Sequence, residues 1–274
     1  MILQVQHITK YQYSHEVFIE PHHLYFHPSF RHYFKLLEFD INISPNLSGI
    51  SFRTDAENNS YHQVWFNDVI TELHIATYLK VETSTINPFN LLVEPNPKLD
   101  HKEALKIHLQ TVDLSDELAN WTKKKSDETG DNLITLLSYL TQSIKLDWIH
   151  EDRYVENLMT PVECFKSRRG SCRDLAWMLI QMLRNLGIAA RFVSGYAFNP
   201  ELTAGHELHA WVEAWVPGAG WIGLDPSTGL FATDQYIPVA ASFKPEHTFP
   251  VQGTYRGAAE AQLSFEVKIQ ALES

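Results

Sequence analysis

The sequence predicts two domains, an antiparallel β domain followed by a region of helices and short strands. Residues 1–85 are rich in β-branched and aromatic residues, which favour strands. Pro88, Pro95 and Pro97 then mark a linker, which we place at residues 86–100. At 274 residues, the chain is long enough to bury a sizeable core and to form two domains.

Helices are expected directly after the linker. Residues 113–125 carry acids at their start and lysines at their end, as the helix dipole favours. Residues 132–146 place leucines at helical spacing. A shorter helix begins at Thr160-Pro161, because Thr160 and Glu163 fit a capping box and proline suits the first helical position.

The next helix carries the residue that indicates chemistry. It opens at Gly170-Ser171-Cys172-Arg173-Asp174, where Ser171 and Asp174 fit another capping box. Its apolar stripe consists of Leu175, Met178, Leu179, Met182, Leu183 and Leu186. Cys172 therefore lies in the first turn, where the unpaired N–H groups favour a thiolate. Only the thiolate attacks a carbonyl well, so Cys172 is a candidate nucleophile.

A histidine and an aspartate follow in strand-like segments. Residues 208–216 alternate, with small and aliphatic residues on one face and His209, Trp211, Glu213 and Trp215 on the other. We expect the first face to be core and the second to carry the chemistry. A turn at residues 217–220 returns the chain in a hairpin that ends at Asp225. His209 is then a candidate base, with Asp225 accepting its Nδ1 proton.

Four longer strings resemble one known family. They are Arg169-Gly170-Ser171-Cys172-Arg173-Asp174-Leu175-Ala176, Leu186-Gly187-Ile188-Ala189-Ala190-Arg191-Phe192-Val193-Ser194-Gly195-Tyr196, His209-Ala210-Trp211-Val212-Glu213 and Gly220-Trp221-Ile222-Gly223-Leu224-Asp225-Pro226. Together they resemble the bacterial transglutaminase-like enzymes, a family often described as cysteine proteases. Residues 6–13 resemble the opening of that family's β-rich N-terminal domain, and residues 253–257 resemble its closing segment.

The resemblance implies an α+β fold, with a papain-like transglutaminase core preceded by the antiparallel β domain. We place that core at residues 101–245 and a C-terminal segment with one β-strand at residues 246–274. The resemblance also implies that Cys172, His209 and Asp225 form a catalytic triad. It leaves the reaction open, since the superfamily contains cross-linking acyltransferases, hydrolases and members without activity.

Three functions remain compatible with the residues. A cysteine protease or amidase releases its thioester to water, and we favour this hydrolase because water needs no second binding site. A transglutaminase passes the same thioester to an amine. A non-catalytic protein-binding module would keep only the fold. The second oxyanion donor stays open among Trp148, Tyr154 and Asn157.

Other uses of the cysteines and histidines fit less well. The spacing of Cys164, Cys172, His206 and His209 is unlike that of structural zinc sites, so we expect no metal and no cofactor. Cys164 lacks the Gly-Ser lead-in and is expected to be structural. Lys166, Arg168, Arg169 and Arg173 form either a basic approach to Cys172 or a solvated loop.

Composition limits the partners. A net charge of −11 argues against nucleic acid or an anionic membrane as the main partner. The resemblance implies a protein or peptide substrate. Two cysteines cannot form a disulfide framework, and residues 1–7 resemble no signal peptide. We therefore expect a bacterial, cytoplasmic protein and leave its oligomeric state open.

Overall fold

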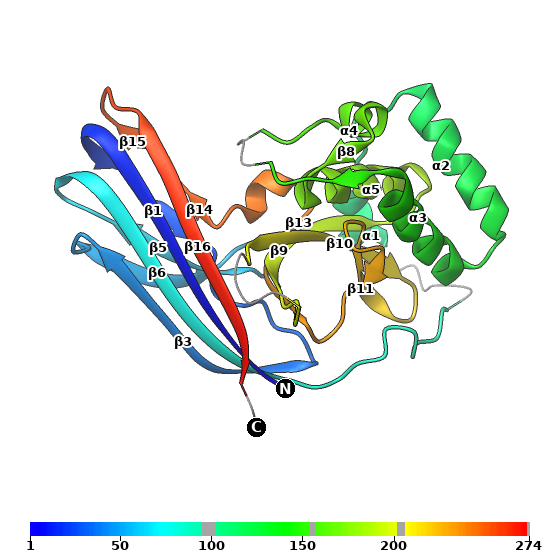
Figure 1. The fold of residues 1–274 in the computed structure, drawn as a ribbon, viewed down its shortest axis with the longest axis horizontal. Helices are drawn as coiled ribbons and strands as arrows, with labels where there is room; N and C mark the ends of the chain where they lie inside the picture. Colours follow the sequence, from blue (N-terminus) through cyan, green and yellow to red (C-terminus); the bar gives the residue numbers. More distant parts are fainter. Residues whose placement is uncertain (95–101, 154–156, 202–205, 273–274) are drawn as a thin grey trace.

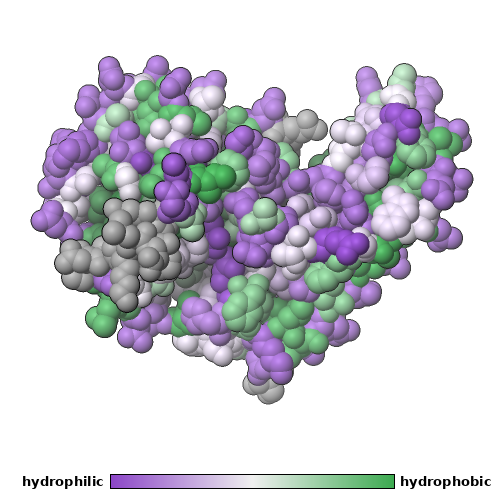
Figure 2. Space-filling view, turned by 180° about the vertical axis from the view of Figure 1, so that it is seen from behind, coloured by the Kyte–Doolittle hydropathy of each residue, from purple (hydrophilic) through white to green (hydrophobic). Residues whose placement is uncertain are grey.

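The computed structural model describes residues 1–94, 102–153, 157–201 and 206–272 (Figure 1). Pro95 and Pro97 of the expected linker lie outside these ranges, as does Tyr154. The described residues form two lobes, a β-sandwich and an α+β core that contains the helices (Figure 1). The space-filling surface is hollowed between the lobes (Figure 2).

Two antiparallel sheets make up the sandwich. The first contains β1 (Ile2–Ile19), β3 (Phe34–Ser44), β6 (Val69–Thr83), β15 (Tyr255–Arg256) and β16 (Ala261–Leu272). The second contains β2 (His22–Leu24), β4 (Gly49–Thr54), β5 (Ser60–Trp65) and β14 (Val251–Gln252). A core between the sheets includes Leu24, Val64 and Ile75, because alternate side chains of each strand point inward.

The C-terminal strand returns to the N-terminal sheet. β16 pairs with β1 from Ile2↔Leu272 to Tyr13↔Ala261. The segment that follows the core in sequence thus contributes three strands to the sandwich. The alternation of β16 buries Val267 and Ile269, whereas Leu263 and Phe265 on the same face stay exposed.

The core lobe contains five α-helices and two short 3-10 helices among the described residues. They are α1 (Lys102–Leu105), η2 (Lys106–Leu109), α2 (Asp116–Thr129), α3 (Leu133–Asp147), α4 (Pro161–Ser167), α5 (Cys172–Asn185) and η3 (Pro245–Thr248). α2 begins three residues later than the charge pattern suggested, because the Ser115 side chain accepts from Leu118 N–H and caps the helix there. Asn132 caps α3 in the same way through Thr135 N–H.

The sheet of this lobe has the strand order β12-β11-β10-β9-β13. The strands are β9 (Ala190–Ala197), β10 (Leu208–Val216), β11 (Gly220–Asp225), β12 (Leu230–Phe231) and β13 (Tyr236–Ser242). The aliphatic face of β10 packs in one core with the apolar stripe of α5. A separate parallel pair joins β7 (Ile149–His150) to β8 (Arg169–Gly170), directly before α5.

The middle of the second face of β10 is buried. Trp211 and Glu213 are 1% and 5% exposed, whereas His209 and Trp215 on the same face are half-buried. Glu213 pairs with Arg191 at 2.6 Å and with Arg31 of the N-terminal lobe at 2.7 Å. Glu213 is thus held in an internal ion-pair cluster, and the alternation predicted its face but not its partners.

A third apolar core joins the two lobes. Leu3, Leu79 and Ile269 of the sandwich pack against Tyr196 and Ile237 of the core lobe. His206, which lies three residues before His209 in the sequence, also forms a β-bridge with Val267 of β16. The sandwich therefore packs against the sheet that carries His209. In the described part of the chain, no helix is long and apolar enough to cross a membrane.

Candidate active site

The capping box fixes Cys172 at the first position of α5. Ser171 Oγ accepts from Asp174 N–H, and Asp174 Oδ2 accepts from Ser171 N–H at 2.8 Å. Gly170 lets the chain approach this turn closely, since a Cβ there would lie 2.8 Å from Asp174 Cβ. Cys172 is half-buried, with its backbone N–H among the first of the helix.

His209 and Asp225 meet across the sheet. His209 lies near the start of β10 and Asp225 at the end of β11, and His209 Nε2 lies 2.8 Å from Asp225 Oδ2. We expected Nδ1 in this contact, and that prediction was wrong, because the nitrogen beside Asp225 is Nε2. Because Nε2 is hydrogen-bonded to Asp225, the hydrogen bond between His209 and Cys172 uses Nδ1.

The electrostatics favour a thiolate–imidazolium pair. Burial alone would raise the pKa of the Cys172 thiol, but the His209 charge and hydrogen bonds from His150, His209 and Ala210 N–H lower it to about 6. Burial would lower the pKa of His209, yet Asp225 and Cys172 raise it well above its ordinary value. The pKa of Asp225 falls well below its usual range, because His209 and its hydrogen-bond donors outweigh burial. All three shifts favour the ionised form of their group.

His150 is a site residue that the sequence reasoning missed. It ends β7, its backbone pairs with Gly170, and Glu151 N–H donates to the Gly170 carbonyl at 3.0 Å. This parallel pairing brings the His150 side chain to the Cys172 sulfur, to which it hydrogen-bonds. A lone histidine after a helix carries no motif, so only the pairing of β7 with β8 reveals it.

The three side chains that we considered for the second oxyanion donor differ in their surroundings. Trp148 is 4% exposed, and its Nε1 donates to the Cys164 carbonyl at 2.9 Å, so its indole is already used within the core. Asn157 is exposed, and its carbonyl accepts from Arg153 Nη2 at 3.3 Å. Tyr154 lies outside the described residues. His150 is therefore the described side chain of this segment that reaches Cys172.

Cys164 differs from Cys172 in burial and in pKa, which control the reactivity of a thiol. It is fully buried inside α4, and burial together with the charge of Asp174 raises its pKa to about 12. Its sulfur lies 3.8 Å from the Arg169 carbonyl. These observations agree with the structural role expected for this thiol.

The arginines around Cys172 contact neighbouring groups of the protein. The Arg168 guanidinium lies over the rings of Trp148 and Phe165, 4.1 and 4.7 Å from their centroids. Arg169 pairs with Glu151 at 3.4 Å, and Arg173 donates to the Arg153 carbonyl at 3.0 Å. These arginines shape the loop around the helix start more than they form an open basic surface.

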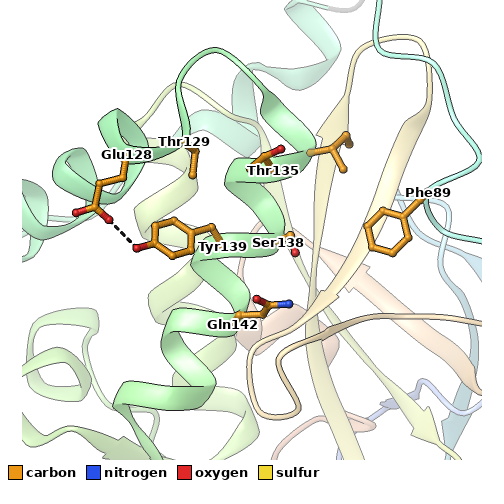
Figure 3. Close-up of a pocket in the computed structure, with 8 residues that line it drawn as sticks. Phe89, Glu128, Thr129, Thr135, Ser138, Tyr139 and Gln142 are labelled. Carbon is orange, nitrogen blue, oxygen red and sulfur yellow. Dashed lines mark hydrogen bonds between the residues drawn. The ribbon is translucent and has the colours of Figure 1, made fainter.

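Two surface hollows lie away from the three candidate residues. The first, of about 630 Å³, is lined by Phe89, by Glu128 and Thr129 of α2, and by one face of α3, including Tyr139, whose hydroxyl donates to Glu128 (Figure 3). The second, of about 460 Å³, includes Trp177 and Pro245 in its wall. Across the described ranges, no group of three or more histidine, cysteine or acidic side chains is placed to hold a metal ion.

The described residues form a papain-like α+β core preceded by a β-rich N-terminal region. Residues 115–226 match the transglutaminase-like superfamily, and residues 3–82 match the bacterial transglutaminase-like N-terminal region. The chain thus contains a transglutaminase-like core and a bacterial transglutaminase-like N-terminal region.

Two curated relatives match part of the chain. The chain is 32% identical, over 134 residues, to an uncharacterized protein of Mycobacterium leprae, a match that covers 47% of this chain and 46% of that protein. It is 40% identical over 70 residues to a protein-glutamine gamma-glutamyltransferase of Pseudomonas aeruginosa, covering 23% and 10% of the two chains. The chain therefore spans less than half the length of these two relatives.

A solved structure shares the whole fold. The crystal structure of a "putative cysteine protease" from Cytophaga hutchinsonii has a TM-score of 0.74 and covers 100% of this chain and 91% of that one. The two sequences are 19% identical. This likeness establishes the architecture, including the β-rich N-terminal region, and nothing about the reaction.

Proposed function

We propose that this protein is a cysteine-dependent acyl-transfer enzyme that acts on an amide or peptide bond, with Cys172, His209 and Asp225 as its catalytic triad. The observation that carries the proposal is the continuous set of hydrogen bonds from Cys172 through His209 to the buried carboxylate of Asp225. This set keeps the thiol ionised near neutral pH and places a proton donor beside it.

The first half of the reaction follows from the charges. The Cys172 thiolate attacks the carbonyl carbon, and the electron pair of the C=O bond moves to the oxygen. The backbone N–H of Cys172 and the His150 side chain supply hydrogen bonds to that oxyanion. The His209 imidazolium then protonates the leaving nitrogen, the C–N bond breaks, and an acyl-thioester on Cys172 remains.

The second half needs an acceptor. Neutral His209 takes a proton from water, the resulting hydroxide attacks the thioester, and the acid product leaves while the thiolate re-forms. We favour this hydrolysis because water needs no second binding site. Transfer to a primary amine is the alternative, and the partial match to a protein-glutamine gamma-glutamyltransferase supports it. A binding module without activity would have no need of an ionised thiol.

One experiment separates these readings. The protein is incubated with a pool of glutamine-containing peptides, with and without a labelled primary amine, and the products are identified by mass spectrometry. A hydrolase gives cleaved or deamidated peptides in both cases, whereas a transglutaminase incorporates the amine and releases ammonia. Cys172→Ala is expected to abolish either product, and Cys164→Ala is the matched control that keeps it. Absent turnover with retention of one peptide by wild type and Cys172→Ala alike would favour the binding module.

A further inference from the structure

The carboxylate of Asp225 is fully buried and fixed from both sides. Its Oδ1 accepts from Ser227 N–H at 2.9 Å and from Ser227 Oγ at 2.7 Å. Its Oδ2 accepts from His209 Nε2 and from Tyr236 Oη, each at 2.8 Å. Four donors fill the lone-pair sites of a carboxylate. The Oδ2 oxygen that holds His209 is therefore held in turn by Tyr236.

The Tyr236 hydroxyl donates to Asp225 from a buried position. It is 7% exposed at the start of β13, and its ring packs edge-to-face on Trp211 with the centroids 5.3 Å apart. Burial and the Asp225 charge raise the pKa of the Tyr236 phenol far above its usual value, so the hydroxyl keeps its proton. In the described chain, the titratable groups hydrogen-bonded to Asp225 are His209 from β10 and Tyr236 from β13.

A segment of the N-terminal lobe holds the backbone of β13. Tyr33 Oη donates to the Tyr236 carbonyl at 2.8 Å. Ser29 N–H donates to the Pro238 carbonyl at 2.7 Å, and Ser29 Oγ donates to the Val239 carbonyl at 2.9 Å. Ser29 and Tyr33 both lie between β2 and β3. This segment of the N-terminal lobe thus donates hydrogen bonds to three carbonyls of β13, the strand that carries Tyr236.

We propose that Tyr236 is a positioning residue for the acyl-transfer reaction, and that Ser29 and Tyr33 of the N-terminal lobe hold it in place. The inference rests on the proposed function, because it takes His209 and Asp225 to serve Cys172. Without the Tyr236 hydroxyl, Oδ2 keeps only the His209 contact, so the carboxylate holds His209 less firmly in its direction toward the thiolate. The N-terminal lobe then contributes to the geometry of the site without touching substrate.

Three tyrosine-to-phenylalanine variants test this relation. Tyr236→Phe removes the bond to Asp225, and Tyr33→Phe removes the bond to the Tyr236 backbone. Tyr255→Phe is the matched control, because its hydroxyl donates to the Ala259 carbonyl at 2.8 Å within the sandwich. The readout is the pH dependence of iodoacetamide alkylation at Cys172, which needs no substrate and reports the thiolate directly.

The expected result is an ordered set of shifts. The alkylation midpoint of Tyr236→Phe moves upward from about 6, because a less well aimed imidazolium stabilises the thiolate less. Tyr33→Phe moves it in the same direction by a smaller amount, and Tyr255→Phe leaves it unchanged. On a substrate found with the peptide pool, kcat of Tyr236→Phe falls about tenfold while KM changes little. Thermal unfolding of the three variants checks that each remains folded.

Two results would overturn the inference in different ways. An unchanged midpoint in folded Tyr236→Phe would remove the positioning role. A shifted midpoint in Tyr236→Phe with none in Tyr33→Phe would confine that role to Tyr236 and remove the part assigned to the N-terminal lobe. Neither result depends on turnover, so both are distinct from failure of the proposed function, which Cys172→Ala reports.

Discussion

Arg153 Nη1 lies 2.6 Å from Asp174 Oδ2, and this ion pair fastens the loop after β7 to the helix that carries Cys172. Asp174 also accepts from Met159 N–H at 2.8 Å while it completes the capping box with Ser171. The carboxylate is 1% exposed. A single buried anion therefore holds the first turn of α5 and binds Arg153 and the Met159 backbone.

Asp174→Ala is expected to lower the free energy of unfolding by about 3 kcal/mol or more, because it leaves a charged partner and several donors unpaired in a buried place. Urea denaturation measures the change. Glu163→Ala is the matched control, since Glu163 completes the capping box of α4 at an exposed position. Equal effects of the two variants would show that the burial of Asp174 contributes nothing.

Iodoacetamide at pH 6 is expected to label Cys172 well before Cys164, since their pKa values are about 6 and about 12. Labelling of Cys172 should fall as the pH drops below 6, because the thiol is then protonated. His209→Ala should slow labelling at pH 6 by removing the charge that lowers the pKa. Peptide mapping by mass spectrometry gives both rates. Equal rates at the two cysteines would mean that Cys172 is an ordinary thiol.

His150→Ala is expected to lower kcat by about 10²-fold, as removal of one oxyanion donor does in other acyl-transfer enzymes. Alkylation by iodoacetamide forms no oxyanion. At an equal thiolate fraction, the alkylation rate of His150→Ala should therefore fall less than its kcat does. His150→Gln keeps a donor and should retain more activity than His150→Ala. Parallel losses of acyl transfer and alkylation would assign His150 to the thiolate alone.

The ion pairs of Glu213 with Arg31 and Arg191 should make part of the free energy of unfolding sensitive to acid. Burial would raise the pKa of Glu213, but Arg191 and Arg31 lower it from 4.5 to about 2. A lowered carboxyl pKa stabilises the fold fully above pH 4.5, and that stabilisation is lost as the pH falls through about 2. The shift corresponds to about 3 kcal/mol at neutral pH. Urea midpoints of wild type and Glu213→Gln should therefore differ at pH 7 and converge near pH 2, and a constant difference would contradict this assignment.

Much of the site could be predicted from the sequence because its signals are local. The capping box of Ser171 and Asp174 needs only four consecutive residues, and the structure has it as expected. The alternation of residues 208–216 predicted the strand that carries His209. Local patterns of this kind depend on hydrogen bonds and periodicity within one element.

What could not be predicted depends on contacts between distant segments. His150 reaches Cys172 only because β7 pairs with β8, and two-residue strands carry no periodicity. The choice of Nε2 for Asp225 follows from the hairpin geometry and the His209 side-chain orientation. The contacts of Ser29 and Arg31 with the core lobe join residues about 180 to 210 positions apart, which no single-sequence pattern encodes.

The most direct test of the account is to detect the thioester itself. The protein is mixed with an activated ester or a reactive glutamine peptide, quenched in acid within the turnover time, and analysed by intact and peptide mass spectrometry. The account predicts an acyl group on Cys172 in wild type and in Cys164→Ala, and no acyl group and no product in Cys172→Ala. Product formation that persists in Cys172→Ala, or an acyl group carried by another residue, would contradict it.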